Sequence, residues 1–587
     1  MLLATCWPTW VLALSPCPPA PAIRAPVEGA EASVSALPDL QAEFVPRLRK
    51  LVRGDVPGVA VAVIESGRVS WAQAFGEADP QSDRAFDIDT PIPLGRWSEL
   101  LLHQVAVALA QANQLALDEP LSDLPADLRW PDSPAPSLRQ LLSHHSGFNG
   151  GRLHGLYADP SQPAPTVAPE QYAVRPPGWL ESYSLVGLQQ AMSRIDLSLQ
   201  EQGSSLESAI AGRLQQILGK DCQRPSLGHG NHPQLAVGHR EGDALPRMIA
   251  RERLPLSLHG SLRGAIALLS PLTDADPGPI WTAMLAVQNA DAALDFDRRV
   301  GLGLDLVDSQ RPRVGRVALL FGAAPGYRAE ARIALEHRLA VIVLANGSDE
   351  DSLGELPGDL LDAVLEARLG IPRRDREPEL PAAVAYPAGL TPTNFADRYA
   401  TPFGRLRVES RFDGGFDFEL FGRGFRARRR ADGWYGISYR LWGFIPLNFK
   451  IFEQTLLGNA RRGEHELLLA HLYGRTLLLG STPTGTTPSV EMDSWLGDYR
   501  LQNPDLLTRS LKIERLILLR ENADLVLEYH LPAPFLQTLK PRVLLETADP
   551  RHLRVAGLGP LLGERLRLQQ SGDQRSVEYA GYRFVRQ

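Results

Sequence analysis

A serine hydroxyl becomes a good nucleophile only beside a base, and a lysine three residues later on the same helical face can supply that base. The chain has only five lysines among its 61 basic residues. The residues three positions before these lysines are Arg47, Ile217, Leu447, Arg509 and Gln537, so the pattern S-x-x-K occurs nowhere in the 587 residues. A G-x-S-x-G nucleophile elbow is also absent. Both local signatures of a serine acyl-enzyme are therefore missing.

Histidines offer a second kind of chemistry. His229, His232 and His239 lie close together in the sequence and could in principle hold a metal ion. No carboxylate follows them at the spacing of a helical zinc-protease motif, and Pro233 disfavours a helix there. Cys222 has no Cys-His motif around it and fits a small buried apolar residue. We therefore expect neither a metal nor any other cofactor.

The composition limits the remaining function classes. Hydrophobic residues make up 44% and charged residues 22% of the chain, as in a globular protein. The formal net charge of -7 gives no basic footprint for nucleic acid, and no apolar run approaches the ~20 residues of a transmembrane helix. Residues 1–22 combine an apolar stretch, Leu2 to Leu14, with the cleavage pattern Ala20-Pro21-Ala22. We expect a signal peptide there, and hence export to the periplasm or cell envelope.

Hydrophobic periodicity predicts the elements of the first large region, which we place at residues 39–372 after a linker at 23–38. An alternating strand from Gly58 to Ile64 turns and returns from Val69 to Phe75, which predicts a β-hairpin. Helices are predicted over 100–117 and over 138–144, the second capped by Ser137 and closed by Gly147. A second hairpin is predicted over 331–335 and 339–344. Strands at both ends with helices between them favour one antiparallel sheet flanked by helices.

Short strands dominate the rest of the chain after a charged, proline-bearing linker at 373–388. Two stretches resemble each other 100 residues apart, from Phe395 to Tyr399 and from Trp495 to Tyr499. Each precedes strand-like runs, such as 406–412 and 525–529, and the chain closes with another such run over 576–585. This repetition predicts two small all-β domains, barrels or lipocalin-like folds, at 389–486 and 487–587.

Nine ordered segments of the first region carry a family resemblance. They are Val56–Val63, Gly76–Asp79, Asn113–Leu121, Ser137–Gly147, Pro177–Ser184, Leu235–His239, Gly301–Gly303, Ala324–Tyr327 and Val343–Asn346. In this order they resemble the superfamily of serine β-lactamases and penicillin-binding proteins, which includes class C β-lactamases, D-alanyl peptidases and related esterases. The resemblance implies an α+β fold and a hydrolase cleft.

The catalytic positions that this resemblance identifies have changed. Alignment on Leu94-Gly95 puts Arg96 where the family has its serine nucleophile and Glu99 where it has the lysine. In the family's Y-x-N element the tyrosine is kept as Tyr183, but the asparagine is replaced by Leu185. On the strand that edges the site, the positions of K-T-G or H-x-G hold Leu320 and Gly322. The sequence therefore predicts a degenerate member without catalytic residues.

The altered residues can be interpreted in two ways. Arg96 and Glu99 are three apart on a helix, so they can form an internal ion pair. Alternatively, Arg96 binds a ligand carboxylate, and Arg96, Glu99 and Tyr183 are the ligand-binding candidates. We favour the internal pair, since the partner is adjacent, and we interpret Tyr183 as a packed relic.

These observations lead to one main hypothesis and two rivals. The main hypothesis is an exported pseudoenzyme that binds a peptide, a cell-wall fragment or a protein partner in the former cleft or through its β-domains. The first rival is a serine hydrolase, of esterase or peptidase type, with a relocated nucleophile such as Ser98 beside Glu99. The second is a binding protein whose β-domains carry the function while the first domain serves as a platform. The sequence does not indicate an oligomeric state.

Overall fold

The computed structural model describes residues 34–35, 37–158, 170–219, 227–229, 232–250, 256–309, 311–348, 353–374, 380–420, 423–441, 445–447, 454–486, 488–511, 513–529, 541–560 and 562–587. The predicted signal peptide, most of the predicted linker at 23–38, and Cys222 lie outside these residues. Within the described residues, no helix is long and apolar enough to cross a membrane.

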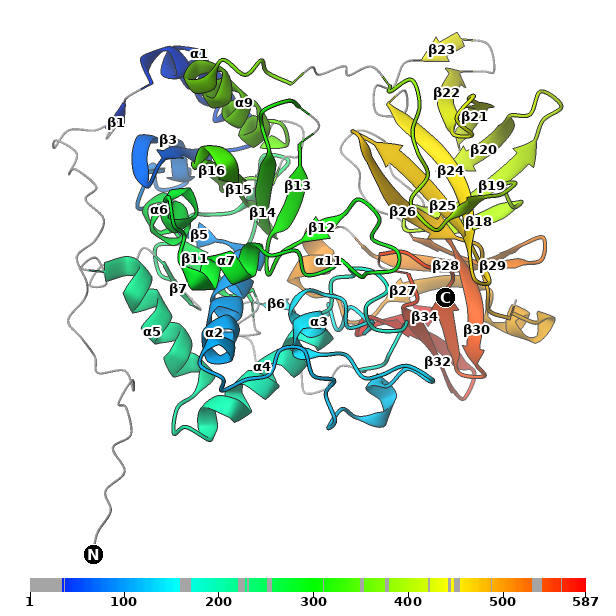
Figure 1. Cartoon of the computed structure of the whole chain (residues 1–587). Coiled ribbons are helices and arrows are strands. Elements are labelled where there is room, and N and C mark those ends of the chain that lie inside the picture. The colour runs from blue at the N-terminus through cyan, green and yellow to red at the C-terminus, as the bar shows by residue number, and fades with distance from the viewer. Residues whose placement is uncertain are drawn as a thin grey trace, which may run out of the picture.

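A nine-stranded antiparallel sheet forms the centre of the first domain (Figure 1). Its order is β1-β3-β2-β16-β15-β14-β13-β12, with β4 added beside β3. The strands are β1 (Val34–Ser35), β2 (Gly58–Glu65), β3 (Arg68–Asp79), β4 (Arg84–Ala85), β12 (Arg299–Val300), β13 (Asp305–Asp308), β14 (Arg316–Ala324), β15 (Tyr327–Ala334) and β16 (Leu339–Ala345). Strands β2 and β16 pair with Leu339 opposite Glu65, so the two ends of the region meet in one sheet. Both predicted hairpins are present.

Helices cover both faces of this sheet. One face packs against α1 (Pro38–Leu51) and α9 (Leu356–Leu369), with Phe44 and Leu360 fully buried. The other face carries a larger core that includes Trp97 and Leu100. Its helices are α2 (Glu99–Gln111), α3 (Leu138–Leu142), α4 (Leu185–Gln200), α5 (Leu206–Leu218), α6 (Leu262–Leu269) and α7 (Pro279–Leu285). The 3-10 turns of the domain are η1 (Gly95–Ser98), η2 (Ala126–Leu128), η4 (Ser270–Thr273) and η5 (Leu335–His337).

Three small sheets complete the first domain. The sheet β5-β11-β7 lies next to the start of η1 and consists of β5 (Ile92–Pro93), β11 (Leu258–Gly260) and β7 (Leu227–His229). The two-stranded sheets pair β6 (Tyr157–Ala158) with β10 (Ile249–Ala250), and β8 (His239–Arg240) with β9 (Asp243–Ala244).

The two helix predictions were too long. Helix α2 ends at Gln111, because Asn113 takes the left-handed conformation with φ of 55° and Gln114 donates its backbone N–H to the Leu109 carbonyl. The apolar pattern continues past this point because Leu117 still packs into the core from a loop. The cap of α3 at Ser137 is confirmed as a capping box, but the helix ends at Leu142 before the predicted 144.

The C-terminal half forms two closed β-barrels of eight strands, stacked in Figure 1 to the right of the first domain. In barrel 1 the ring closes because β24 pairs with both β25 and β22. Its strands are β18 (Arg398–Thr401), β19 (Gly404–Ser410), β20 (Phe416–Leu420), β21 (Arg423–Arg429), β22 (Tyr435–Leu441), β24 (Thr455–Arg462), β25 (His465–Leu472) and β26 (Arg475–Ser481), with β17 (Thr391–Pro392) and β23 (Ile445–Leu447) attached. The predicted α+β fold with two small β-domains is thus confirmed.

Barrel 2 follows with the 3-10 turn η6 (Val490–Trp495) before it and helix α11 (Leu506–Ser510) after its first strand. Its strands are β27 (Gly497–Leu501), β28 (Arg515–Glu521), β29 (Asp524–Tyr529), β30 (Arg542–Asp549), β31 (His552–Val555), β32 (Arg565–Ser571), β33 (Gln574–Tyr579) and β34 (Tyr582–Arg586). The run 576–585, predicted as one strand, contains a turn at Ala580 and Gly581, both with positive φ, and therefore forms parts of two strands.

The repeated sequence stretch has one structural meaning in both barrels. Tyr399 and Tyr499 lie near the start of the first strand of their barrels, β18 and β27, and are completely buried. The Tyr399 hydroxyl accepts a hydrogen bond from the Ala396 N–H at 2.9 Å, and the Tyr499 hydroxyl donates to the Trp495 carbonyl at 2.6 Å. Each tyrosine thus holds the segment that precedes the first strand against its barrel.

Barrel 2 is attached to the first domain by a buried polar contact. Glu564 accepts hydrogen bonds from the Gly150 N–H at 2.6 Å and from the Tyr172 hydroxyl at 3.1 Å. The Arg175 guanidinium donates to the Leu562 carbonyl at 2.5 Å from a side chain that is almost fully buried. Because such groups are costly to bury unpaired, this contact holds Gly150, Tyr172 and Arg175 of the first domain against the barrel.

Candidate functional site: the degenerate catalytic position

Arg96 lies on η1 and Glu99 on the first turn of α2, at the positions that the family resemblance aligns with the catalytic serine and lysine. The turn is held close to the sheet, because a Cβ on Gly322 of β14 would lie 2.1 Å from the Leu94 carbonyl oxygen. Gly95 has φ of 54°, and a Cβ there would lie 2.4 Å from the Ala323 carbonyl oxygen. Glycines at both positions therefore permit the close approach of η1 to β14.

Glu99 is the centre of the site, with a side chain that is fully buried. Its Oε1 accepts a hydrogen bond from the Tyr183 hydroxyl at 2.9 Å and lies 3.5 Å from the Arg96 Nε. Its Oε2 lies 3.1 Å from the His144 Nε2. The Arg96 guanidinium also stacks over the Tyr183 ring, at 4.9 Å from its centroid. The internal ion pair expected from the sequence is thus present, within a network of four side chains.

The electrostatics of this network fix its protonation. Burial alone would raise the pKa of Glu99, but the positive charge of Arg96 and the contact with His144 outweigh it and lower that pKa. Burial, together with the Glu99 carboxylate, raises the pKa of the Tyr183 phenol well above its usual value. At neutral pH, Glu99 is therefore an ionised hydrogen-bond acceptor and Tyr183 a protonated donor.

The substituted positions of the other two motifs have become part of the core. Leu185 is 3% exposed and begins α4, whose N-cap is Ser184 with its hydroxyl accepting the Gly187 N–H. Leu320 on β14 is 2% exposed and belongs to the main core cluster. These side chains offer no hydrogen bond to a substrate, so the structure provides neither the amide nor the basic group of the family.

Ser98, the relocated nucleophile of the rival hypothesis, is not directed at Glu99. Its hydroxyl donates to the Gly95 carbonyl at 2.7 Å and accepts the Leu258 N–H at 2.9 Å. The residue is 2% exposed. The hydroxyl proton is therefore donated to a carbonyl oxygen, and the two hydrogen bonds of Ser98 connect η1 to β11.

Little free space remains in front of this network. The cavity there has a volume of about 20 Å³ and is lined in part by Arg96, His144 and Phe321. This is room for about one water molecule. Two carboxylates, Glu181 and Asp305, also line it, and both bind Arg298, at 2.9 and 3.3 Å. Two arginines thus face three carboxylates including Glu99, so a further ligand carboxylate meets a site that is already anionic.

Two histidines near Glu99, one inside the network and one beside it, were not identified from the sequence as site residues. His144 lies in the family segment Ser137–Gly147 and contacts Glu99 directly. His103 stands four residues after Glu99 on α2 and is fully buried; neither of its ring nitrogens has a hydrogen-bond partner among the described residues. Burial lowers the pKa of His103 to about 4, so the ring is neutral at pH 7. The i, i+4 spacing from Glu99 was a signal for this proximity.

The histidines considered as metal ligands do not form a cluster in the described part of the chain, where no group of three or more His, Cys, Asp or Glu side chains could hold a metal ion. His239 is buried, and its Nδ1 lies 2.9 Å from the Val237 carbonyl oxygen. His232 packs against His259 with ring centroids 5.0 Å apart. The side chain of His229 is outside the described residues.

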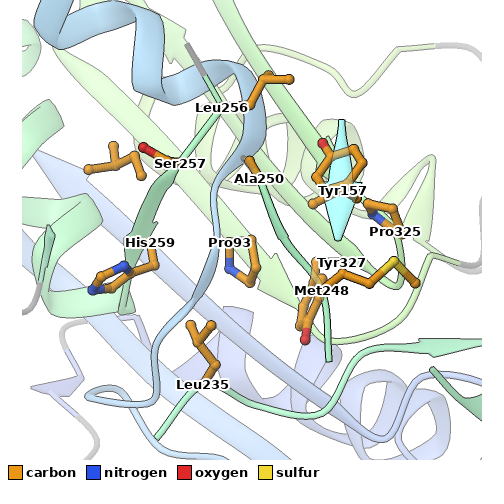
Figure 2. Close-up of a pocket in the computed structure, with 12 residues that line it drawn as sticks. Pro93, Tyr157, Leu235, Met248, Ala250, Leu256, Ser257, His259, Pro325 and Tyr327 are labelled. Atoms are coloured by element: carbon orange, nitrogen blue, oxygen red, sulfur yellow. The ribbon is translucent and has the colours of Figure 1, made fainter. Parts of the chain in front are cut away.

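A second small cavity lies around the beginning of η1 and the end of β14 (Figure 2). It also measures about 20 Å³, and Pro93, Met248 and Tyr327 are among the side chains that surround it. Tyr327 donates its hydroxyl to the Ala236 carbonyl at 2.8 Å, and burial raises the pKa of its phenol to about 12. This largely apolar pocket has room for no more than a water-sized molecule.

Comparisons with known proteins agree with the fold. The family model described as Beta-lactamase matches residues 36–194. A structure described as SurE with D-Leu aligns over 76% of this chain and 100% of its own, with 20% sequence identity and a TM-score of 0.50. An octameric penicillin-binding protein homologue from Pyrococcus abyssi aligns over 94% of this chain and 100% of its own, with 14% identity and a TM-score of 0.45. No curated protein matches the sequence.

The match of the family model to residues 36–194 confirms the family predicted from the nine sequence segments. The first domain belongs to the superfamily of serine β-lactamases and penicillin-binding proteins.

Proposed function

We propose that this chain is a catalytically inactive, exported member of the β-lactamase superfamily that acts by binding a peptide, a cell-wall fragment or a protein partner. The observation that carries the proposal is the network around Glu99. Arg96 stands in the place of the serine nucleophile, and its guanidinium lies 3.5 Å from the Glu99 carboxylate that replaces the lysine. An arginine is protonated at any physiological pH and cannot attack a carbonyl carbon.

The contacts of Ser98 and Tyr183 support the same conclusion. Acyl transfer requires a hydroxyl or thiol within hydrogen-bond reach of a base, and an oxyanion site beside it. The hydroxyl nearest in sequence, that of Ser98, is buried and donates to the Gly95 carbonyl. The Tyr183 hydroxyl donates to Glu99 and has a raised pKa, so it does not assist proton transfer.

The size of the remaining cavity indicates where binding takes place. A pocket of about 20 Å³ in front of Arg96 does not accommodate a peptide. The two barrels, in contrast, contact the loops that flank this position: Glu564 of barrel 2 holds Gly150, and the Thr476 N–H of barrel 1 donates to Asp297 at 2.6 Å. We therefore assign recognition to the surfaces that the barrels form with these loops. The apolar segment at 2–14 supports export.

Covalent labelling tests the catalytic part of the proposal. Purified full-length protein is incubated with a fluorescent penicillin and with a chromogenic cephalosporin, and an active class C β-lactamase serves as the positive control. We expect no stoichiometric label and no turnover. Labelling of the intact chain near one equivalent, or hydrolysis above the rate of the heat-denatured protein, contradicts the proposal.

A fluorophosphonate probe followed by peptide mapping distinguishes the hydrolase alternative from the proposed loss of catalysis. A relocated serine nucleophile gives an adduct in the peptide that contains Ser98, and the adduct disappears in the variant Ser98→Ala. We expect no adduct there, since the hydroxyl is 2% exposed and bonded on both sides.

A further inference from the structure

An open cavity lies beside the first domain, where all three domains meet. A cavity of about 290 Å³ is bounded by Trp179 and Leu294 of the first domain, by the turn between β24 and β25 of barrel 1, and by Leu558, which follows β31 of barrel 2. Its volume is near the lower end of the range for small-molecule sites. It is more than ten times the volume of the cavity at Arg96, so it admits a ligand where the old site does not.

The floor of this junction cavity is apolar. Leu294 is 2% exposed and Leu467 is fully buried, and both belong to one hydrophobic cluster with Trp179 and Leu558 at its margin. Trp179 meets His465 edge to face, with centroids 5.6 Å apart and an interplanar angle of 87°. Burial of a ligand's apolar side chain against these walls is favourable, because it removes apolar surface from water.

One buried polar atom faces this region without a partner. The Nδ1 of His465 has no hydrogen-bond partner among the described residues, and the residue lines the cavity. Burial lowers the pKa of His465, which leaves the imidazole neutral at pH 7. An unmatched buried nitrogen costs free energy in the empty protein, and a ligand that hydrogen-bonds to it removes that cost.

The rim carries one charge of each sign on a single two-residue turn. Arg462 ends β24 and is exposed, and one of its guanidinium nitrogens donates to the Ala293 carbonyl. Gly463 takes φ of 59°, and the exposed Glu464 follows, with its Oε1 3.8 Å from the His465 Nε2. The turn thus holds a cation and an anion beside one apolar cavity.

We propose that the junction cavity binds a hydrophobic amino-acid group that carries both an ammonium and a carboxylate, as a free amino acid or a short peptide. The apolar side chain enters between Trp179 and Leu467, the carboxylate is bound by Arg462, and the ammonium is bound by Glu464. Charge complementarity favours a zwitterion over a simple acid or amine, because each of these leaves one rim charge unmatched. The site is separate from the Glu99 network and lies where the barrels meet the loops of the first domain, so the inference rests on the binding part of the proposed function and does not depend on the loss of catalysis.

Three matched probes test the charge pattern on the full-length protein. L-Phenylalanine carries both charges, 3-phenylpropionate lacks the ammonium, and phenethylamine lacks the carboxylate. We expect saturable binding of phenylalanine in calorimetric titration or saturation-transfer NMR, and affinities about tenfold weaker for the other two, as the loss of one charged contact predicts. The dipeptide Phe-Phe distinguishes the two sources: tighter binding than phenylalanine indicates a peptide ligand, and weaker binding indicates a free amino acid.

Variants locate the binding to this cavity. Ala293→Phe and Leu467→Trp fill the space, the first from the half-buried rim and the second from the core, and both abolish binding of phenylalanine. Arg462→Gln weakens phenylalanine and 3-phenylpropionate but not phenethylamine, whereas Glu464→Gln weakens phenylalanine and phenethylamine but not 3-phenylpropionate.

The proposal is overturned if no probe binds at about 10 mM, a concentration at which weak ligands are still detected. It is also overturned if the three probes bind equally, or if a folded Ala293→Phe protein binds phenylalanine as the wild type does. Penicillin labelling decides the loss of catalysis independently of these results.

Discussion

The former catalytic position and the junction cavity contain similar residue types but differ in how their charges are paired. At the former, a fully buried Glu99 is in contact with Arg96, His144 and Tyr183, and about 20 Å³ of space is left. At the latter, Arg462 and Glu464 are exposed around about 290 Å³ of apolar space. Groups that satisfy one another inside a protein stabilise its fold, whereas groups that face an open cavity are available to a ligand. This difference in pairing and space is the reason why we place binding at the junction cavity and not at Arg96.

Removing the buried carboxylate is the strongest test of this difference. We expect Glu99→Ala to destabilise the first domain by about 3–5 kcal/mol, because it leaves Arg96 without its buried counter-charge and the His144 Nε2 without its Glu99 partner. Glu99→Gln keeps the shape of the side chain, so we expect a smaller loss of stability, of about 1–3 kcal/mol. Native-state hydrogen exchange of the α2 amides measures the stability of the first domain separately from that of the barrels.

The matched control for this change is Glu464→Gln at the cavity rim. It removes the same charge from an exposed turn, and we expect it to alter stability by no more than about 0.5 kcal/mol. Equal effects of the two substitutions would contradict the distinction between a structural and an available charge.

Truncating one leucine in each region compares their packing. Leu320→Ala opens a void in a filled core, so a loss of about 3–5 kcal/mol is expected. Leu467→Ala extends a cavity that already exists, where part of the side chain has no neighbour to lose, and a loss of about 2–3 kcal/mol is expected. Hydrogen exchange of the β14 and β25 amides measures the two losses of stability. A larger loss for Leu467→Ala than for Leu320→Ala would show that the junction is tightly packed.

The pH dependence of stability distinguishes the two regions through their histidines. Because the folded state holds the pKa of His103 at about 4 instead of 6.5, the unfolded chain binds the extra proton between these values. Stability from this group is therefore complete above pH 6.5 and falls as the pH is lowered toward 4, by up to about 3 kcal/mol. His465, which is less deeply buried, contributes in the same direction with a smaller amplitude.

The variant His103→Gln flattens this dependence between pH 6.5 and 4, and His465→Gln flattens it less. Exchange-derived stabilities at pH 4.5 and pH 7 measure both effects. A wild-type stability that is constant over this range, or a greater effect at His465, would refute the assignment.

The sequence predicted the fold more completely than the site, for a physical reason. Strand alternation and the nine family segments are local, and they identified both hairpins of the sheet and the region of each barrel. The ion pair of Arg96 with Glu99 was also predictable, because the partners are three residues apart on one turn. The contacts of Glu99 with His144 and Tyr183 join residues 45 and 84 positions away, and no local pattern encodes them.

The junction cavity was beyond prediction for the same reason. Its walls come from residues near 179, 294, 465 and 558, which meet only after three domains have folded and packed. Two helix ends were also misplaced, because Asn113 and His144 adopt positive φ without a glycine to signal it. Tertiary contacts, rather than propensity, decide such positions.

The pairing of β2 with β16 has a consequence for how this protein is made. Strands β2 and β3 leave the ribosome early, but the partner that covers the other edge of β2 is synthesised only near the end of the first domain. Until then a strand of almost continuous valine and alanine, from Gly58 to Glu65, presents an unpaired edge that can associate with other chains. Closure over such a long sequence separation is slow. The yield of folded protein should therefore be set by the time this edge stays open, so slower synthesis near residues 339–345 should lower it.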